Sequence, residues 1–187
     1  SEVTKVQEQA IPHGLMGKDL LVSSKTGSGK TLAFLLPALQ RVLTQKALSK
    51  KDARVLILAP TRELAKQVFN ELLPFTKQTG LKPALLVGGE NYNDQVKVLK
   101  KSPTFVVGTP GRVTDHLFGH SLFLNGLELL IFDEADRMLD LGFSAQLTEI
   151  NKAADHRKRQ TLMFSATLHS VHVNELAASL QKKPHRI

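Results

Sequence analysis

Short runs of branched and aromatic apolar residues alternate along the chain with longer segments whose apolar residues recur every three or four positions. The short runs predict strands, and the longer segments predict amphipathic helices. Strands are expected at Asp19–Ser24, Arg54–Ala59, Lys82–Val87, Thr104–Val107, Leu127–Phe132 and Gln160–Phe164. Helices are expected at Lys30–Lys46, Arg62–Thr79, Asn91–Lys101, Gly111–Phe118, Ser144–Ala154 and Ser170–Gln181.

This alternation of strand and helix is typical of repeated βα units around a parallel sheet. We therefore predict an α/β fold with a doubly wound, mainly parallel sheet and helices on both faces. Such sheets bind ligands at the carboxyl ends of their strands, so functional side chains are expected at the strand-to-helix junctions. The polar stretches Ser49–Asp52 and Asp155–Arg159 are interpreted as solvated loops.

Composition and charge narrow the class of protein. The chain has 187 residues, 42% hydrophobic and 22% charged, which is typical of one globular domain. An excess of 25 basic over 17 acidic residues suits a polyanionic partner without proving one. The absence of cysteine excludes disulfides and thiolate metal sites. No apolar run approaches the roughly 18 residues of a membrane span, and the polar start at Ser1 does not resemble a signal peptide.

A glycine-rich loop lies between the first predicted strand and its helix. Its residues are Thr26, Gly27, Ser28, Gly29, Lys30 and Thr31. Glycines let backbone N–H groups surround phosphate oxygens at a helix N-terminus, where the helix dipole favours an anion. Lys30 would then contact the β and γ phosphates, and Thr31 would offer its hydroxyl to Mg²⁺. The alternative is a flexible loop beside a lysine, and the usual spacing has glycine where this chain has Ser24.

Two carboxylates follow the buried run Leu129–Phe132. Asp133 would hold Mg²⁺ through its water shell, and Glu134 would orient the attacking water. Taken alone, the pair could be an acidic turn leaving a sheet. The phosphate loop favours a nucleotide-hydrolysing site instead. A GTPase is disfavoured, because the guanine-reading pattern N-K-x-D fails at Asn151–Asp155 by one residue.

The carboxylate pair continues through Ala135 to Asp136, and here the chain resembles the first RecA-like domain of DEAD-box ATP-dependent RNA helicases. Other family motifs stand in the same order, namely Pro60–Ala65, Gly88–Gly89, Thr109–Arg112 and Ser165–Thr167. The resemblance implies ATP and Mg²⁺ as cofactors. It also implies that residues 1–187 form an ATP-binding domain, cut upstream of the family's glutamine motif and without the second RecA-like domain.

The segment Thr4–Gln7, followed by Ile11 and Pro12, is similar to that glutamine motif, which reads adenine. The chemistry fits, because a carboxamide offers a donor and an acceptor together and can pair with adenine N6 and N7. Without the resemblance, Gln7 would be interpreted as a helix-surface residue.

The RNA-binding residues implied by the resemblance lie in loops after the second, third and fourth predicted strands. They are Pro60, Thr61, Arg62, Gly88, Gly89, Thr109, Pro110, Gly111 and Arg112. Arg62 opens a helix, so its guanidinium and the helix N–H groups could share one phosphate. Aromatic residues are scarce at these junctions, which favours sequence-independent contact with the RNA backbone. The alternative for each motif alone is ordinary turn and helix-start chemistry.

The resemblance further implies that Ser165 and Thr167 connect hydrolysis, through Asp136, to strand separation, although Ser165 could equally be a helix N-cap. His169 and His172 are interpreted as surface residues rather than metal ligands. We expect the ATP-binding half of an intracellular RNA helicase, cytoplasmic or, in a eukaryote, nuclear or nucleolar. It would unwind short duplexes or remodel ribonucleoprotein, with RNA, the second domain and accessory proteins as partners. An ATP-switched RNA clamp and a DNA helicase are the alternatives.

Overall fold

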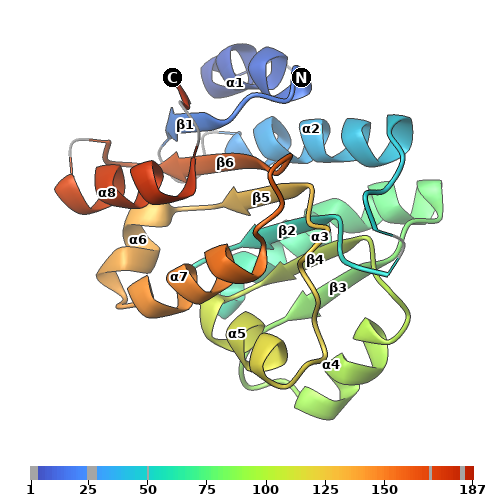
Figure 1. Ribbon diagram of the computed structural model, residues 1–187. Helices are drawn as coiled ribbons and strands as arrows, with labels where there is room; N and C mark the ends of the chain where they lie inside the picture. The colour runs from blue at the N-terminus through green and yellow to red at the C-terminus, as the bar shows by residue number, and fades with distance from the viewer. Residues whose placement is uncertain (1–3, 25–28, 50, 169, 182–183) are drawn as a thin grey trace.

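The computed structural model describes residues 4–24, 29–49, 51–168, 170–181 and 184–187 (Figure 1). Its sheet has seven strands in the order β3-β4-β2-β5-β6-β1-β7, and all neighbouring pairs are parallel. The predicted doubly wound α/β fold is therefore confirmed. The strands are β1 (Leu20–Ser23), β2 (Val55–Leu58), β3 (Pro83–Leu86), β4 (Phe105–Gly108), β5 (Leu129–Phe132), β6 (Gln160–Ser165) and β7 (His185–Arg186).

The helices in the described residues include every helix that the sequence predicts, with ends shifted by at most two residues. They are α1 (Lys5–Leu15), α2 (Lys30–Thr44), α3 (Arg62–Thr79), α4 (Tyr92–Leu99), α5 (Pro110–Phe118), α6 (Ala135–Asp140), α7 (Ser144–Ala153) and α8 (Val171–Leu180). Helices α1 and α6 and strand β7 were not predicted. None of the described helices combines the length and apolarity needed to cross a lipid bilayer.

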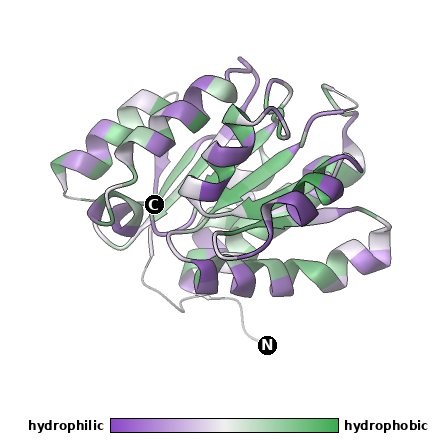
Figure 2. Ribbon diagram, turned by 90° about the horizontal axis from the view of Figure 1, so that it is seen from below, coloured by the Kyte–Doolittle hydropathy of each residue, from purple (hydrophilic) through white to green (hydrophobic). Residues whose placement is uncertain are grey.

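Successive residues of each strand face opposite sides of the sheet, which creates two separate apolar cores. On β2, Ile57 packs in the core beneath α1, α2 and α3, whereas Leu56 and Leu58 pack in the core that holds apolar residues of α4 to α8. Figure 2 shows hydrophobic strands at the centre of the molecule and helices whose polar residues lie toward the outside. Because both faces are covered, the strands read as continuous apolar runs.

The strand order divides the carboxyl edge of the sheet into two halves. β3, β4 and β2 form one half, and β5, β6 and β1 form the other. The predicted RNA-facing loops follow the first set, and the predicted nucleotide-binding residues follow the second. The two halves meet at β2 and β5, where the backbone N–H of Asp133 donates a 2.8 Å hydrogen bond to the carbonyl of Leu58.

Candidate functional site

Lys30 is the centre of a buried charge cluster. It is the first residue of α2, and its Nζ lies 2.9 Å from Asp133 Oδ1 and 3.0 Å from Glu134 Oε2. All three side chains are less than 10% exposed. The structure thus brings Lys30 into contact with two carboxylates that follow it by more than 100 residues in the sequence. Thr26, Gly27 and Ser28 of the predicted phosphate loop lie outside the described residues.

The local backbone aims these groups at one another. Gly29 has a φ of 78° and precedes the first turn of α2, a left-handed conformation that glycine adopts without steric cost. Glu134 also has a positive φ, 58°, which is uncommon outside glycine and costs about 1 kcal/mol or more. Its carboxylate is held by Lys30 on one oxygen, while Arg137 lies 3.9 Å from the other.

Burial raises the pKa of Asp133 above its ordinary value, and the adjacent Lys30 ammonium opposes that shift. Asp133 and Thr31 line the same pocket, together with Lys30 and Glu134. Carboxylate and hydroxyl oxygens are the donors that Mg²⁺ prefers in proteins. The residues present therefore fit a magnesium ion in chemical type.

Gln7 lies on α1 and is buried, not on the helix surface. Its Nε2 donates a 3.1 Å hydrogen bond to the carbonyl of Gly29, and its Oε1 accepts one of 3.0 Å from the backbone N–H of Thr4. The Thr4 hydroxyl accepts in return from the Gln7 backbone N–H, which completes a capping box at the start of α1. Gln7, the predicted adenine reader, thus also fixes α1 to Gly29, the N-cap residue of α2.

A pocket of about 520 Å³ surrounds this cluster. Besides Gln7, Gly29 and the charged residues, its lining includes residues of α3 that sequence reasoning missed, namely Leu64, Gln67, Val68 and Glu71. They recur at intervals of three or four residues, so they lie along one stripe of α3. That periodicity was visible in the sequence, but it does not show which stripe of a helix borders a ligand site.

The predicted coupling residues meet at the ends of β5 and β6. The Thr167 hydroxyl donates a 3.4 Å hydrogen bond to Asp136 Oδ2, and the buried Ser165 hydroxyl donates to the carbonyl of Thr167 at 3.0 Å. In this structure, therefore, Ser165 stabilises its own turn, while Thr167 reaches the acidic motif. His172 lies on α8, and His169 falls outside the described residues.

On the other half of the edge, the predicted RNA-binding loops lie next to one another. Arg62 is the first residue of α3, behind Pro60 and the N-cap Thr61. A Cβ on Gly89 would lie 2.5 Å from Arg62 Nη1, so the guanidinium occupies the space that glycine leaves. Lys66 pairs with Glu90 at 2.9 Å, and the hydrogen bond and positive charge of that lysine lower the pKa of Glu90 below its ordinary value.

The fourth-strand loop differs from the others in how its arginine is held. Thr109 and Pro110 are buried, whereas a Cβ on Gly111 would meet open space. Arg112 is only 16% exposed, and its Nη1 donates to the carbonyl of Glu90 at 2.9 Å and to Gln95 Oε1 at 3.1 Å. Its Nη1 group is therefore already engaged by other residues of the protein.

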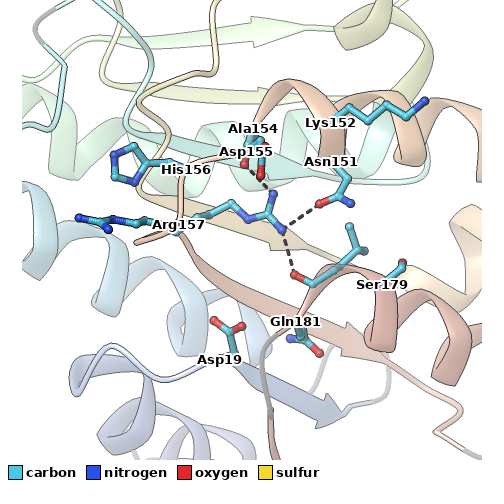
Figure 3. A pocket seen from close by; sticks show the side chains of 11 residues that line it. Asp19, Asn151, Lys152, Ala154, Asp155, His156, Arg157, Ser179 and Gln181 are labelled. Atoms are coloured by element: carbon cyan, nitrogen blue, oxygen red, sulfur yellow. Dashed lines mark hydrogen bonds between the residues drawn. The ribbon is translucent and has the colours of Figure 1, made fainter.

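A second hollow, of about 420 Å³, lies at the amino ends of β1 and β6, away from the charge cluster. Figure 3 shows residues that line it, among them Asn151, Ser179 and Gln181. Its central cation, Arg159, donates hydrogen bonds to the carbonyls of Ala154 and Leu180 and to the Asn151 amide oxygen. These contacts join α7 to α8, so the role of this arginine is structural.

A parallel α/β sheet with a buried lysine at a helix start, paired with two carboxylates from a neighbouring strand end, defines a nucleotide-hydrolysing domain of the RecA-like class. The chain belongs to the DEAD/DEAH box helicase family, whose family model matches residues 4–176.

Relatives support this assignment. The chain is 45% identical over its whole length to the probable ATP-dependent RNA helicase ddx27 of Dictyostelium discoideum, and 44% identical over 95% of its length to the ATP-dependent RNA helicase DRS1 of Debaryomyces hansenii. It spans 24% and 23%, respectively, of those two proteins. The crystal structure of a hypothetical ATP-dependent RNA helicase from Sulfolobus tokodaii superposes on all of the chain with a TM-score of 0.88 at 31% identity, and the chain covers 53% of it.

Proposed function

We propose that this chain is the ATP-binding domain of an ATP-dependent RNA helicase that unwinds short duplexes or remodels ribonucleoprotein inside the cell. The observation that carries the proposal is the cluster of Lys30, Asp133 and Glu134. It places a lysine at the start of a helix, where backbone N–H groups and the helix dipole favour a phosphate, next to two carboxylates.

In the proposed reaction, Lys30 binds the terminal phosphates and exchanges its carboxylate partners for phosphate oxygens. Glu134, freed from Lys30, accepts a hydrogen bond from the attacking water and orients it for in-line displacement. Asp133 and Thr31 would hold Mg²⁺, which neutralises charge that develops on the phosphate oxygens. Gln7 would contact adenine, while its hydrogen bond to Gly29 keeps α1 against the phosphate loop.

The RNA backbone would lie along the loops after β2, β3 and β4, which contain Pro60–Arg62, Gly88–Gly89 and Thr109–Arg112. Asp136, Ser165 and Thr167 would connect that surface to the nucleotide. We further propose that a second RecA-like domain of the same protein completes the γ-phosphate site, and that accessory proteins bind elsewhere. The relatives, about four times longer than this chain, have room for such a domain.

Calorimetric titration of the chain with ADP and with GDP tests the nucleotide assignment. We expect binding of ADP and a clear preference for it over GDP. Equal affinity for the two bases, or no binding of either, would contradict the proposal.

Filter binding of two unrelated single strands at several salt concentrations tests the RNA assignment. Binding should be independent of sequence and should weaken steeply with salt, because it depends on phosphate contacts.

A further inference from the structure

The side-chain amide of Gln95 joins three parts of the proposed RNA-binding edge. Gln95 lies on α4 and is 6% exposed. Its Nε2 donates a 3.0 Å hydrogen bond to the carbonyl of Val87, the residue before Gly88 and Gly89. Its Oε1 accepts from Arg112 Nη1 at 3.1 Å and from His116 Nε2 at 2.7 Å, both of them on α5.

The orientation of this amide and the tautomer of His116 follow from the partners. The Val87 carbonyl can only accept, so the NH₂ group of Gln95 must face it. The remaining oxygen must then receive donors, and Arg112 has no acceptor to offer. His116 consequently carries a proton on Nε2, while its Nδ1 lies 2.7 Å from the Ser121 hydroxyl, which is also within 3.2 Å of the His116 carbonyl.

Arg112 is held from several sides at once. Besides Gln95, it donates to the carbonyl of Glu90, its Nε lies 3.5 Å from Asp115, and its Cζ lies 5.7 Å from the centroid of the Tyr92 ring. The Tyr92 ring in turn stacks on His116, with centroids 4.2 Å apart and planes inclined by 3°. The guanidinium thus forms part of a packed cluster between α4 and α5.

We propose that Gln95 is a positioning residue that holds the loop at 88–90 and the loop at 109–112 in one fixed arrangement. Arg112 acts within this cluster as a tie between the two loops and not as a phosphate ligand. The surfaces left for RNA phosphates are the backbone amides beside Gly88 and Gly111, where an added Cβ meets no atom within 4 Å. The inference rests on the proposed RNA-binding function and assigns a task to residues that do not touch RNA.

Gln95→Leu removes all three hydrogen bonds and keeps a side chain of similar size. Leu99→Ala is the matched control, because Leu99 is buried on the same helix, belongs to the apolar core and offers no polar side-chain atom to either loop. Both variants are expected to lower thermal stability. A positioning role further predicts that the loops at 88–90 and 109–112 become more mobile in Gln95→Leu but not in Leu99→Ala.

The first measurement is made without RNA. Backbone NMR order parameters of Gly88, Gly89 and Gly111 should fall in Gln95→Leu toward the values below about 0.6 that mark flexible loops. They should stay unchanged in Leu99→Ala. Unchanged order parameters in Gln95→Leu would overturn the proposal, whatever the protein does with RNA.

The second measurement is the affinity for a single-stranded RNA at several salt concentrations, below the unfolding temperature of each variant. If the loops occupy the binding arrangement about a tenth of the time, Gln95→Leu binds roughly tenfold more weakly. Its salt slope should equal that of the unaltered chain, as should that of Arg112→Gln. Arg62→Ala, which removes an exposed cation, should lower the slope by about 0.7.

A salt slope for Arg112→Gln as low as that for Arg62→Ala would show that Arg112 is a phosphate ligand and would overturn its assignment as a tie. Equal RNA affinities of Gln95→Leu and Leu99→Ala would overturn the role of Gln95. An unaltered chain that binds no RNA would contradict the proposed function, and the order parameters would still decide the positioning role separately.

Discussion

Lys30 supplies the positive charge between two buried carboxylates, so its removal has two separable consequences. Lys30→Ala should lose most of the affinity for ADP, because the β-phosphate loses its cationic partner. It should also lower the free energy of unfolding by about 3 kcal/mol, because it leaves buried carboxylates unpaired. Calorimetric titration measures the first effect, and thermal unfolding measures the second.

The double variant Lys30→Ala/Glu134→Gln is the control, since it removes one of the unpaired carboxylates. It should recover part of the lost stability and none of the ADP affinity. A single variant as stable as the unaltered chain would show that the ion pairs contribute little to the fold.

His116 makes stability depend on pH. Burial, with Arg112 nearby, lowers the pKa of His116 from 6.5 to about 4, although Asp115 acts in the opposite direction. Between these two pH values the unfolded chain binds more protons than the folded one, so stability rises with pH across this window and is complete above it. The unfolding temperature should therefore fall as the pH is lowered from 7 to 5.

Replacing this histidine isolates its contribution. His116→Gln should unfold at a lower temperature at pH 7 but lose less stability on acidification than the unaltered chain. His120→Gln, at an exposed position after the same helix, should leave the pH dependence unchanged. Parallel pH profiles for the unaltered chain and His116→Gln would contradict this assignment.

The sequence predicts the residues of the charge cluster, but it does not predict the buried polar pair of Gln95 and His116. Lys30, Asp133 and Glu134 each stand at a strand-to-helix junction, and parallel topology brings such junctions to one edge. Gln95 and His116 are single polar residues inside predicted helices, a pattern typical of solvated surface. Only the packing of α4 beside α5 reveals them as a buried pair, so local sequence gave no signal.

At the scale of elements, the apolar strands were predictable because they are buried on both faces and read as uninterrupted runs. Helix α1 was missed because Pro12 and Gly14 interrupt its apolar pattern. Helix α6 has six residues and β7 has two, which is too short for a period to show. These elements depend on tertiary contacts, such as the pairing of β7 with β1.

The loop at Asp155–Arg159 is the element where the prediction of a solvated segment was wrong in part. Arg159 is partly buried, and its guanidinium donates to Ala154, Asn151, Leu180 and Thr161. Arg159→Ala should lower the free energy of unfolding by about 3 kcal/mol, because each buried carbonyl left unpaired costs about 1–3 kcal/mol. Chemical denaturation of the variant measures this loss.

Lys158→Ala is the matched control, since that side chain is exposed on the same loop. It should change stability by no more than about 0.5 kcal/mol. ADP affinity should be unchanged in both variants, because the Arg159 hollow lies at the amino ends of the strands. A similar small effect for the two substitutions would show that the hydrogen bonds to α7 and α8 are dispensable.

At the scale of the whole molecule, the proposed nucleotide pocket is short of positive charge. Among the described residues that line it, Lys30 is the one cation, against Glu71, Asp133 and Glu134. Phosphoryl transfer develops negative charge that arginines usually neutralise, and such an arginine contributes roughly 10³ to 10⁵ in turnover where it is present. The chain alone should therefore bind ATP but hydrolyse it slowly, with little stimulation by RNA.

Steady-state ATPase assays with and without RNA measure this deficit. The comparison is a longer protein in which this chain is joined to the proposed second RecA-like domain, and Glu134→Gln in that protein should bind ATP and RNA while hydrolysing little. RNA-stimulated turnover of the isolated chain at the rate of the longer protein would show that no outside arginine is needed.

The hydrogen bond from the backbone N–H of Asp133 to the carbonyl of Leu58 joins the end of β5 to the end of β2. Asp133 belongs to the buried charge cluster, and β2 precedes the proposed RNA-binding loop at Pro60–Arg62. Pro60, Thr61 and Arg62 follow Leu58 within four residues, and β2, which ends at Leu58, is paired on both sides by parallel strands. The distance between the carboxylate of Asp133, proposed to hold Mg²⁺, and the start of α3, proposed to face RNA, is therefore fixed by the backbone of the sheet. If the proposed function holds, ATP therefore acts on RNA by reorienting this domain as a whole relative to the proposed second RecA-like domain, and not by changing that distance.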